Sequence, residues 1–362
     1  MADHPERPPE HALVAAARRL ADDLLAPDAE RVDAEGVPAS HLAALVDAGM
    51  AGISAPVAAG GAAAPPAVFR EVVELLAGAD LSTWFVLAQH YGPVARVAAA
   101  GRRPDLLAEL VSGRALAGVA FAHLRRLPHR AVTATPLAGG AYRLDGEAPW
   151  YTGWGLNDVA VVAGATEGGD VVFACLPARE AGGLTAGPPL RLAALSATRT
   201  VALALDGVVV PTADVIEVLP AQAWAAADRA VAVNATPMTF GVARRALDLL
   251  ADVDQPAARR AATGLREQLA DVRATAYGLV DAVPSGRPLE EADVARRLAV
   301  RARAGRLAVE AATALVVAGA GRSMLLASPA QRLLREAAFV LVQAQTAEAR
   351  AAALEQWATP GA

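Results

Sequence analysis

The sequence predicts a mostly helical α+β protein with three parts. We expect an N-terminal helical domain (residues 1–116), a middle antiparallel β-barrel domain (residues 117–219) and a C-terminal four-helix bundle (residues 220–362). Apolar residues recur at helical spacing in the first and last parts, whereas six short β-prone runs, separated by Gly, Pro, Asp and Asn, lie between them. The chain is 54% hydrophobic, mostly Ala, Val and Leu, which suits close helix packing.

The first part is predicted to be helical apart from its loops. A helix over residues 11–31 is expected to stop near Pro27, and a second helix over residues 40–48 is expected to end before Gly49. The segment AGGAAAPPA is typical of a loop. Two long helices and a shorter one then follow, over residues 66–80, 82–101 and 104–113.

The middle part is predicted to contain strands, because its β-prone runs are short and bounded by turn residues. The segment AGGAYRLDG has turn residues on both sides of a strand, as a hairpin would. The six runs cover residues 116–123, 129–137, 141–148, 158–166, 170–177 and 200–211.

The last part is predicted to form an up-down helical bundle. A linker over residues 284–293 divides it, and Pro237 interrupts its first helical stretch. The four helical stretches cover residues 224–253, 257–283, 289–323 and 328–358.

Composition excludes several classes of function. The net charge of −5 leaves no basic footprint for nucleic acid. No apolar stretch reaches the roughly 18 residues of a membrane span, and the polar N-terminus lacks an apolar signal core, so a cytoplasmic protein is expected. The single Cys175 excludes an internal disulfide and a cysteine metal cluster.

The absence of lysine excludes further chemistry. All 33 basic residues are arginine, which rules out a Schiff-base lysine and a Walker phosphate loop. The six histidines show no HxxxH or HExxH spacing, and neither GxSxG nor GxGxxG occurs. No metal site is therefore expected.

An aromatic cluster precedes the fourth β-prone run. The chain has only 6 Phe, 5 Trp and 4 Tyr, yet Trp150, Tyr151 and Trp154 fall within five positions. Such rings either fill a core or line a site for a flat ligand, and the cluster alone does not decide between the two.

Four motifs in this order resemble the acyl-CoA dehydrogenase superfamily. They are LAALVDAGMAGISAPVAAGG, YRLDGEAPWYTGWGLNDVAVVAG, ATRTVALALDGVVVP and ALVVAGAGRSMLLASPAQRLLREA. The resemblance implies a flavoprotein that binds FAD, oxidises an acyl thioester of CoA or of a carrier protein, and forms a homodimer or tetramer.

The resemblance also implies the flavin contacts. Trp150 would pack on the isoalloxazine ring and Thr152 would hydrogen-bond near its N5 edge, whereas Trp154 has no counterpart and is expected in a core or cavity wall. The family's Thr/Ser pair after an early strand is missing. His123 stands there with Arg125 and Arg126, and arginines bind phosphate by forked hydrogen bonds.

The remaining implied cofactor contacts lie later in the chain. Thr198 and Thr200 match the family's pair at the adenosine diphosphate part. Arg260 matches an arginine that reaches the pyrophosphate from a neighbouring subunit, although Thr263 replaces the family's Phe. Gly319 and Gly321 match a glycine turn at the adenine end.

The usual catalytic base is absent. Where most of the family has a Glu, this chain has Gln343 or Ala344, and Glu348 lies about one helical turn further on. Some members place the base on an earlier helix, which would make Asp228 the candidate. Asp228 also suits the first turn of a helix because of the helix dipole.

Three interpretations stay open. The first is an FAD enzyme of acyl-CoA dehydrogenase type with a non-standard base. The second is a flavin-dependent monooxygenase of the same fold, in which Ser82, Trp84 and His90 would line the substrate cavity together with Gln343. The third is a non-catalytic partner subunit that pairs with a second acyl-CoA dehydrogenase-like chain in a hetero-oligomer.

Overall fold

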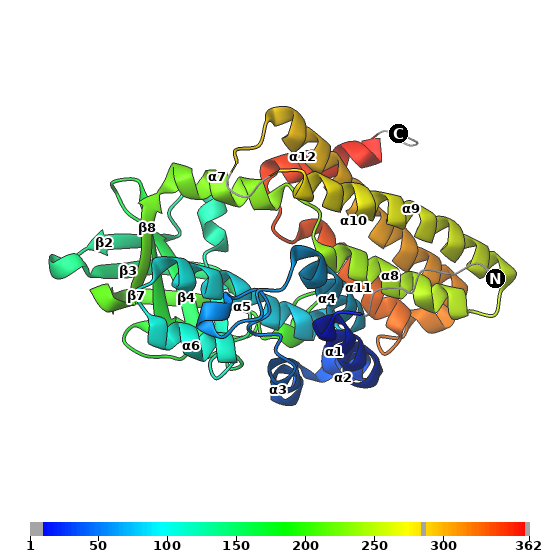
Figure 1. The fold of residues 1–362 in the computed structure, drawn as a ribbon, viewed down its shortest axis with the longest axis horizontal. Helices are drawn as coiled ribbons and strands as arrows, with labels where there is room; N and C mark the ends of the chain where they lie inside the picture. The colour runs from blue at the N-terminus through cyan, green and yellow to red at the C-terminus, as the bar shows by residue number, and fades with distance from the viewer. Residues whose placement is uncertain (1–9, 284–286, 359–362) are drawn as a thin grey trace, which may run out of the picture.

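The computed structural model describes residues 10–283 and 287–358. The strands gather at one end of the longest axis and the C-terminal helices at the other, with the first helices beside both (Figure 1). Residues 284–286 of the expected linker lie outside the described residues.

Helices make up the N-terminal part, as expected. They are α1 (Ala12–Leu20), the π-helical turn η1 (Ala21–Leu25), α2 (Ala26–Glu35), α3 (Ala39–Asp47), α4 (Pro66–Ala79), α5 (Leu81–Ala100) and α6 (Pro104–Ser112).

The expected stop near Pro27 is wrong. The chain stays helical through the π-helical turn and on to Glu35. Pro27 lies directly after that turn. The π-helical turn interrupts the regular i→i−4 hydrogen bonds, as the Ala26 N–H to the Ala21 carbonyl shows, and so accommodates a residue without an N–H. The predicted end of α3 is confirmed, because Gly49 has the left-handed φ of 80°.

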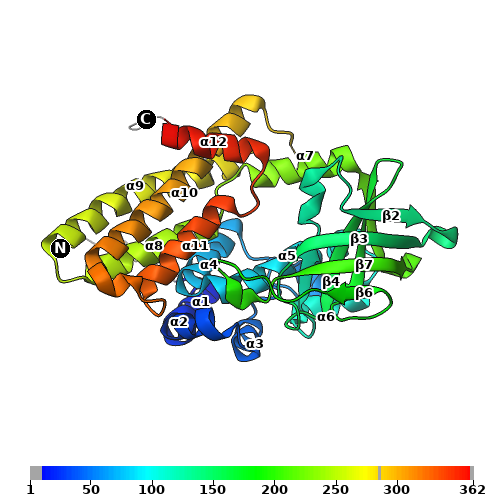
Figure 2. The same ribbon diagram turned by 180° about the vertical axis from the view of Figure 1, so that it is seen from behind.

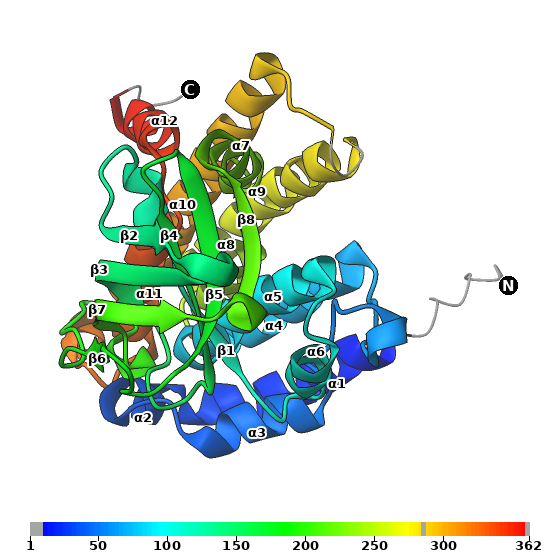
Figure 3. The same ribbon diagram turned by 90° about the vertical axis from the view of Figure 1, so that its left-hand side faces the viewer.

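The strands form one mixed sheet rather than an antiparallel barrel. Its order is β6-β7-β3-β2-β4-β5-β8, with β1 attached to β4. Figure 3 faces this sheet. The bounds are β1 (Ala117–Ala120), β2 (Val132–Pro136), β3 (Tyr142–Tyr151), β4 (Val159–Ala165), β5 (Asp170–Pro177), β6 (Leu184–Ala186), β7 (Val201–Val210) and β8 (Val215–Pro220).

The parallel contacts are the reason for this correction. β1 pairs with β4 in parallel from Ala117 opposite Val159, and β2 meets β4 in parallel at Thr133 opposite Ala165. Periodicity identifies a strand but not its partner, so the sequence could not show these pairings. The sequence also missed β6 and β8, whereas the expected β2–β3 hairpin is confirmed.

The C-terminal part contains six helices among the described residues. They are α7 (Ala221–Ala232), α8 (Pro237–Asp252), α9 (Pro256–Asp281), α10 (Glu291–Gly319), α11 (Pro329–Val342) and α12 (Ala347–Ala358). Helices α8 to α11 form the bundle, and α10 contacts α8, α9, α11 and α12 (Figure 2).

The last predicted helix is in fact two. α11 ends at Val342 and α12 begins at Ala347, with Ala344 between them at a left-handed φ of 49°. Neither Gly nor Pro marks this break, so helical periodicity runs through it. The Arg301 guanidinium on α10 donates a hydrogen bond of 2.6 Å to the carbonyl of Gln343, which holds the chain out of the helix.

Helix α10 differs from the expectation that no apolar stretch is long enough to span a membrane. Together with the short turn that follows, it spans Glu291–Met324 and contains an 18-residue stretch with a mean hydropathy of 1.3, so it is long and apolar enough to cross a membrane by length and composition. A core helix of a soluble protein passes the same test, and α10 is in contact with four other helices. Its composition is therefore that of a bundle centre.

Helices α4 and α8 cross in backbone contact. A Cβ on Gly241 would lie 2.4 Å from the Glu74 carbonyl oxygen, and one on Gly78 would lie 2.7 Å from the Gly241 carbonyl oxygen. Only glycine allows two helices to approach this closely. This crossing joins the N-terminal helices to the bundle.

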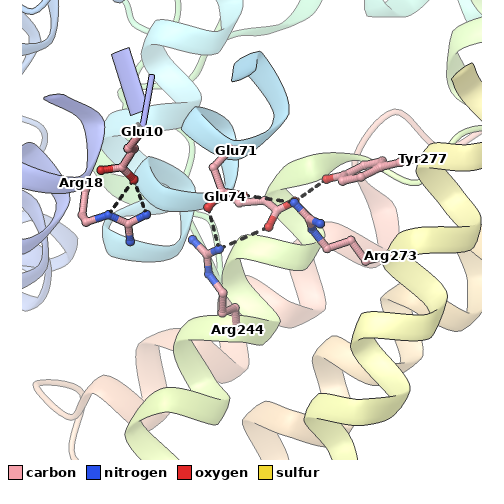
Figure 4. A network of polar contacts seen from close by, with 7 residues as sticks. All are labelled: Glu10, Arg18, Glu71, Glu74, Arg244, Arg273 and Tyr277. Atoms are coloured by element: carbon pink, nitrogen blue, oxygen red, sulfur yellow. Dashed lines mark hydrogen bonds and ion pairs between the residues drawn. The ribbon is translucent and has the colours of Figure 1, made fainter. Parts of the chain in front are cut away.

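A buried carboxylate lies at the same crossing (Figure 4). Glu74 is 1% exposed and accepts hydrogen bonds of 2.6 Å from Arg273 and 2.5 Å from the Tyr277 hydroxyl. Arg244 and Arg273 also contact Glu71. The carboxylate of α4 is thus paired with cations of α8 and α9, as a buried charge requires.

We predict that Gly241→Ala lowers the free energy of unfolding by about 1–3 kcal/mol or more, because the new methyl group collides with backbone. Gly278→Ala in α9 is the matched control. A Cβ there meets nothing within 4 Å. Its higher helix propensity should raise stability by up to about 1 kcal/mol. Urea unfolding measures both, and equal effects would contradict the close crossing.

Candidate functional site

The aromatic cluster divides into packing and outward-facing rings. Tyr151 is fully buried, and Trp154 packs edge-on against it with ring centroids 5.9 Å apart. A Cβ on Gly118 would lie 2.7 Å from Tyr151, so a glycine is needed beside it. Trp150 is 52% exposed at the end of β3. Trp154 therefore serves the core, and Trp150 alone offers a ring to a ligand.

Three threonines next to Trp150 form a hydrogen-bonded chain. Thr152 lies 3.0 Å from Thr200, and Thr200 lies 2.9 Å from Thr198, between hydroxyl oxygens. Thr198 donates its hydroxyl proton to the Leu195 carbonyl at 2.7 Å. All three threonines are buried. The structure thus brings Thr152 next to Thr200, which lies 48 positions later in the chain, and Thr198 extends the same hydrogen-bonded chain.

The direction of donation along this threonine chain follows from the Leu195 carbonyl at its end. A carbonyl only accepts, so the single proton of Thr198 is committed to Leu195. Thr200 must then donate to Thr198, and Thr152 must donate to Thr200. The Thr152 oxygen is left with acceptor lone pairs only. It suits a ligand group that carries an N–H or O–H.

His123 is buried and uncharged. Its Nε2 contacts the Ala163 carbonyl at 3.0 Å, and its Nδ1 is buried without a hydrogen-bond partner. Burial lowers the pKa of His123 to about 4. A neutral imidazole that donates through Nε2 offers Nδ1 as an acceptor, so it does not supply a positive charge to a phosphate.

Arg125 and Asp228 form a two-bond ion pair. The guanidinium donates from Nε and Nη2 to the two carboxylate oxygens, at 2.7 Å each. The pair links the turn after β1 to α7. Arg125, the candidate phosphate-binding residue, and Asp228, the candidate alternative base, are therefore paired with each other.

The α11–α12 loop contains Gln343 and Ala344, where the resemblance would place the usual Glu. The Gln343 carbonyl accepts from Arg301, and its side-chain Oε1 is buried without a partner. Glu348, the nearest carboxylate along the chain, accepts from Arg229 of α7 at 2.8 Å. This loop presents an amide and a held backbone rather than a free carboxylate.

Trp84 and His90 lie in packed surroundings. Trp84 is 2% exposed and lies against Tyr91, with ring centroids 5.7 Å apart. His90 contacts the Leu110 carbonyl through Nε2 at 3.1 Å and accepts the Ala117 N–H on Nδ1 at 3.0 Å. Burial lowers its pKa to about 4. Both ring nitrogens of His90 thus join α5 to α6 and β1.

The structure does not gather the residues expected at the pyrophosphate and adenine end. Arg260 is exposed in the second turn of α9, inside a continuous helix rather than at a helix junction. Gly319 ends α10, where a Cβ would lie 2.3 Å from the Ser323 hydroxyl. Gly321 has no atom within 4 Å of such a Cβ.

The residues fit the ring end of a flavin better than its phosphate end. Trp150 offers a half-exposed aromatic face, and Thr152 offers a fixed acceptor beside it. Arg125 is already paired, and Arg260 projects from the bundle. Among the described residues of this one chain, Trp150 and Thr152 could therefore contact a planar ring, whereas Arg125 and Arg260 are not placed to bind its diphosphate.

Sequence reasoning missed one cation near the α11–α12 loop. Arg301 lies on the buried face of α10, between Leu298, Ala302 and Gly305. Burial lowers its pKa to about 10, and the charge of Arg125 acts in the same direction. The sequence did contain a signal for this buried cation, namely an arginine within the apolar stripe of a helix.

Comparison with known proteins supports the superfamily resemblance. Residues 7–114 match the family model of the acyl-CoA dehydrogenase N-terminal domain. No curated protein sequence matches the chain significantly. The solved structures that resemble it do so over nearly their whole length.

Butyryl-CoA dehydrogenase from Megasphaera elsdenii has a TM-score of 0.80 at 18% identity, covering 96% of this chain and 97% of its own. Dibenzothiophene monooxygenase from Paenibacillus sp. A11-2 has a TM-score of 0.79 at 19% identity, with the same coverage. An electron transferring flavoprotein of Acidaminococcus fermentans has a TM-score of 0.81 at 18% identity, covering 99% of this chain and 100% of its own.

The fold is that of the acyl-CoA dehydrogenases and their relatives. Residues 7–114 are recognised as an acyl-CoA dehydrogenase N-terminal domain, and the fold shared with the solved structures extends through the sheet and the bundle. At such low identity the solved structures define the architecture, and the chemistry has to be argued from the residues.

We predict that His123 makes stability pH-dependent. Its pKa in the folded chain, about 4, lies below the ordinary value of 6.5, so protonation favours unfolding. The stabilisation is complete above about pH 6.5 and is lost as the pH falls towards 4. His123→Gln keeps an N–H for Ala163 but does not titrate.

The variant should therefore lose less stability than the wild type over this range, by up to about 3 kcal/mol at pH 4. His129→Gln, which changes an exposed imidazole in the same segment, is the control. Thermal unfolding at pH 4 to 7.5 measures the difference, and parallel curves for all three proteins would contradict it.

Proposed function

We propose that this chain is a flavin-dependent oxidoreductase that binds FAD against Trp150 and Thr152 and acts on an acyl thioester of CoA or of a carrier protein. The observation that carries the proposal is the half-exposed Trp150 ring beside the directed threonine chain. A planar ring system is recognised by an aromatic face and a few placed polar groups.

Each residue has a defined part in this proposal. Trp150 covers the ring and keeps water from it. Thr152, held by Thr200, presents an acceptor at the ring edge. Bound FAD would supply the two-electron acceptor that the oxidation needs. Diphosphate ligands would come from a second copy of the chain, in a homodimer or tetramer, or from a related partner chain.

In the dehydrogenase form of the proposal, Asp228 is the base that takes the α-proton. It would have to leave Arg125 first. Asp228→Asn should then lower the rate of flavin reduction by an acyl thioester at least 100-fold, roughly the contribution of a placed base.

Arg125→Gln should act in the opposite direction, because it releases the carboxylate. Stopped-flow absorbance under anaerobic conditions measures both rates. If the ion pair is only structural, the two variants lose similar stability and reduce flavin at the wild-type rate, which would remove Asp228 as the base.

A same-fold monooxygenase is the second candidate, and two observations favour it. The α11–α12 loop holds Gln343 where a base would stand, and the threonine chain leaves Thr152 as an acceptor. Reduced flavin carries an N–H at N5 and oxidised flavin does not. A fixed acceptor there favours binding of the reduced form.

We predict that the protein binds reduced flavin more tightly than oxidised flavin. Thr200→Val breaks the threonine chain and lets the Thr152 hydroxyl turn and donate. One hydrogen bond of about 1 kcal/mol corresponds to roughly 20 mV for two electrons, so the midpoint potential of bound flavin should fall by about that amount.

Thr133→Val, which removes a threonine hydrogen bond in β2, is the control and should leave the potential unchanged. The first measurement is the absorption spectrum of purified protein from 300 to 550 nm, with and without added FAD. A protein that stays colourless with FAD would refute the proposal and favour a non-catalytic partner subunit.

A further inference from the structure

A buried amide closes the loop that follows Trp150 and Thr152. Asn157 is 6% exposed, and its Nδ2 donates a hydrogen bond of 3.0 Å to the Thr152 carbonyl. Its backbone N–H donates to the Gly153 carbonyl, also at 3.0 Å. The Asn157 side chain thus reaches back to the residue that the proposed function places at the edge of the flavin.

Two glycines leave room for this amide. A Cβ on Gly153 would lie 2.4 Å from Nδ2 of Asn157, and a Cβ on Gly118 of β1 would lie 2.6 Å from the same atom. The Cβ on Gly118 would also lie 2.7 Å from the Tyr151 hydroxyl oxygen, so the amide and this hydroxyl border the same space. The amide therefore packs against two consecutive residues of the aromatic segment, Tyr151 and Thr152.

The loop between Thr152 and Asn157 has little rigidity of its own. Gly153 and Gly155 have left-handed φ values of 89° and 74°, and glycine loses more conformational freedom on ordering than any other residue. The Gly153 N–H donates to the Thr198 carbonyl at 2.9 Å, which ties the loop to the segment before β7. The Asn157 amide ties it at the other end, to the strand that carries Trp150.

Thr152 is consequently held at two different groups. Its hydroxyl is fixed by Thr200 at 3.0 Å, and its carbonyl is fixed by Asn157 at the same distance. If the carbonyl were released, the peptide that follows could rotate, and the hydroxyl and the neighbouring Trp150 ring would no longer keep a fixed relative position. A binding face that is ordered beforehand has less entropy to lose on binding.

We propose that Asn157 is a positioning residue of the flavin site. It fixes the backbone from Trp150 to Thr152, so that the aromatic face and the hydroxyl acceptor meet the isoalloxazine ring together. It acts through Thr152, whose carbonyl takes its hydrogen bond. This inference rests on the proposed function, because it requires a flavin at this face.

A purely structural role for Asn157 predicts a different result. A side chain that only closes a loop would change the free energy of unfolding and leave the affinity of the folded protein for a flavin unchanged. A positioning residue changes that affinity, and it does so for any ligand that carries the ring. The dissociation constants therefore separate the two roles, whatever the stability of each variant.

The test is titration of the full-length protein with FAD and, separately, with riboflavin, which has the same ring and no phosphate. Asn157→Ala should raise both dissociation constants by about 10-fold, because the loop then has to be ordered on binding. Asn157→Asp keeps the size of the side chain but removes the donor, so it should behave like Asn157→Ala at neutral pH. At low pH its protonated carboxyl can donate to Thr152, and its affinity relative to the wild type should recover.

Asn234→Ala is the matched control. The Asn234 amide also donates to a backbone carbonyl, that of Ala230 at 2.9 Å, but it lies at the end of α7 and not in the loop after β3. This variant should leave both dissociation constants unchanged. Flavin fluorescence measures all of these titrations.

Hydrogen exchange of the flavin-free protein gives a second readout. The N–H groups of Gly153 and Trp154 donate to the Thr198 and Arg199 carbonyls, at 2.9 and 3.2 Å. In Asn157→Ala these two amides should exchange about 10-fold faster, because the loop opens more often. Asn234→Ala should not change their exchange.

The outcomes distinguish this inference from the proposed function. If the wild type binds both flavins and Asn157→Ala binds them equally well, the role of Asn157 is overturned and the proposed function stands. A loss of affinity for FAD alone would also overturn it, because the effect would then lie at the diphosphate. A wild type that binds neither flavin would remove the proposed function and this inference with it. If Asn157→Ala does not fold, Asn157→Asp and its recovery at low pH decide.

Discussion

The structure depends on the backbone contact between α4 and α8. Gly78 and Gly241 let the two helices touch, and Glu74 lies at the point of contact with Arg273 and Tyr277 around it. A side chain at either glycine would separate the N-terminal helices from the bundle. Helix α5 follows α4 directly and contacts β1, so the same contact also places the sheet.

Because the chain has no lysine, arginine takes the roles that lysine and arginine usually share. It neutralises buried carboxylates, as Arg332 does for Glu336, whose pKa is still raised to about 7 because burial outweighs the pairing. It also holds helix ends through backbone carbonyls, as Arg301 does. A planar guanidinium serves both uses because it donates in several directions at once. The polar connections between helices are therefore directional and sensitive to single substitutions.

The candidate flavin face has a hydrogen-bonded support of buried threonines, and ion pairs lie near the α11–α12 loop. The threonine chain is anchored on the Leu195 carbonyl, in the loop before β7, whereas α7 and α12 each carry one end of an ion pair to a neighbouring element, Arg125–Asp228 and Arg229–Glu348. Exposed ion pairs contribute little stability.

The sequence by itself determined the three-part order, most helix bounds, the hairpin and the resemblance to the acyl-CoA dehydrogenases, because these follow from local periodicity, turn residues and motifs. It also led to the prediction that Trp150 and Thr152 contact a flavin, which stays a prediction. Only the tertiary structure decided the parallel partners of β4, the break after Val342, the pairing of Arg125 with Asp228 and the half-buried cation at Arg301. Each of these depends on groups far apart in the chain meeting in space, and local sequence carries no record of such meetings.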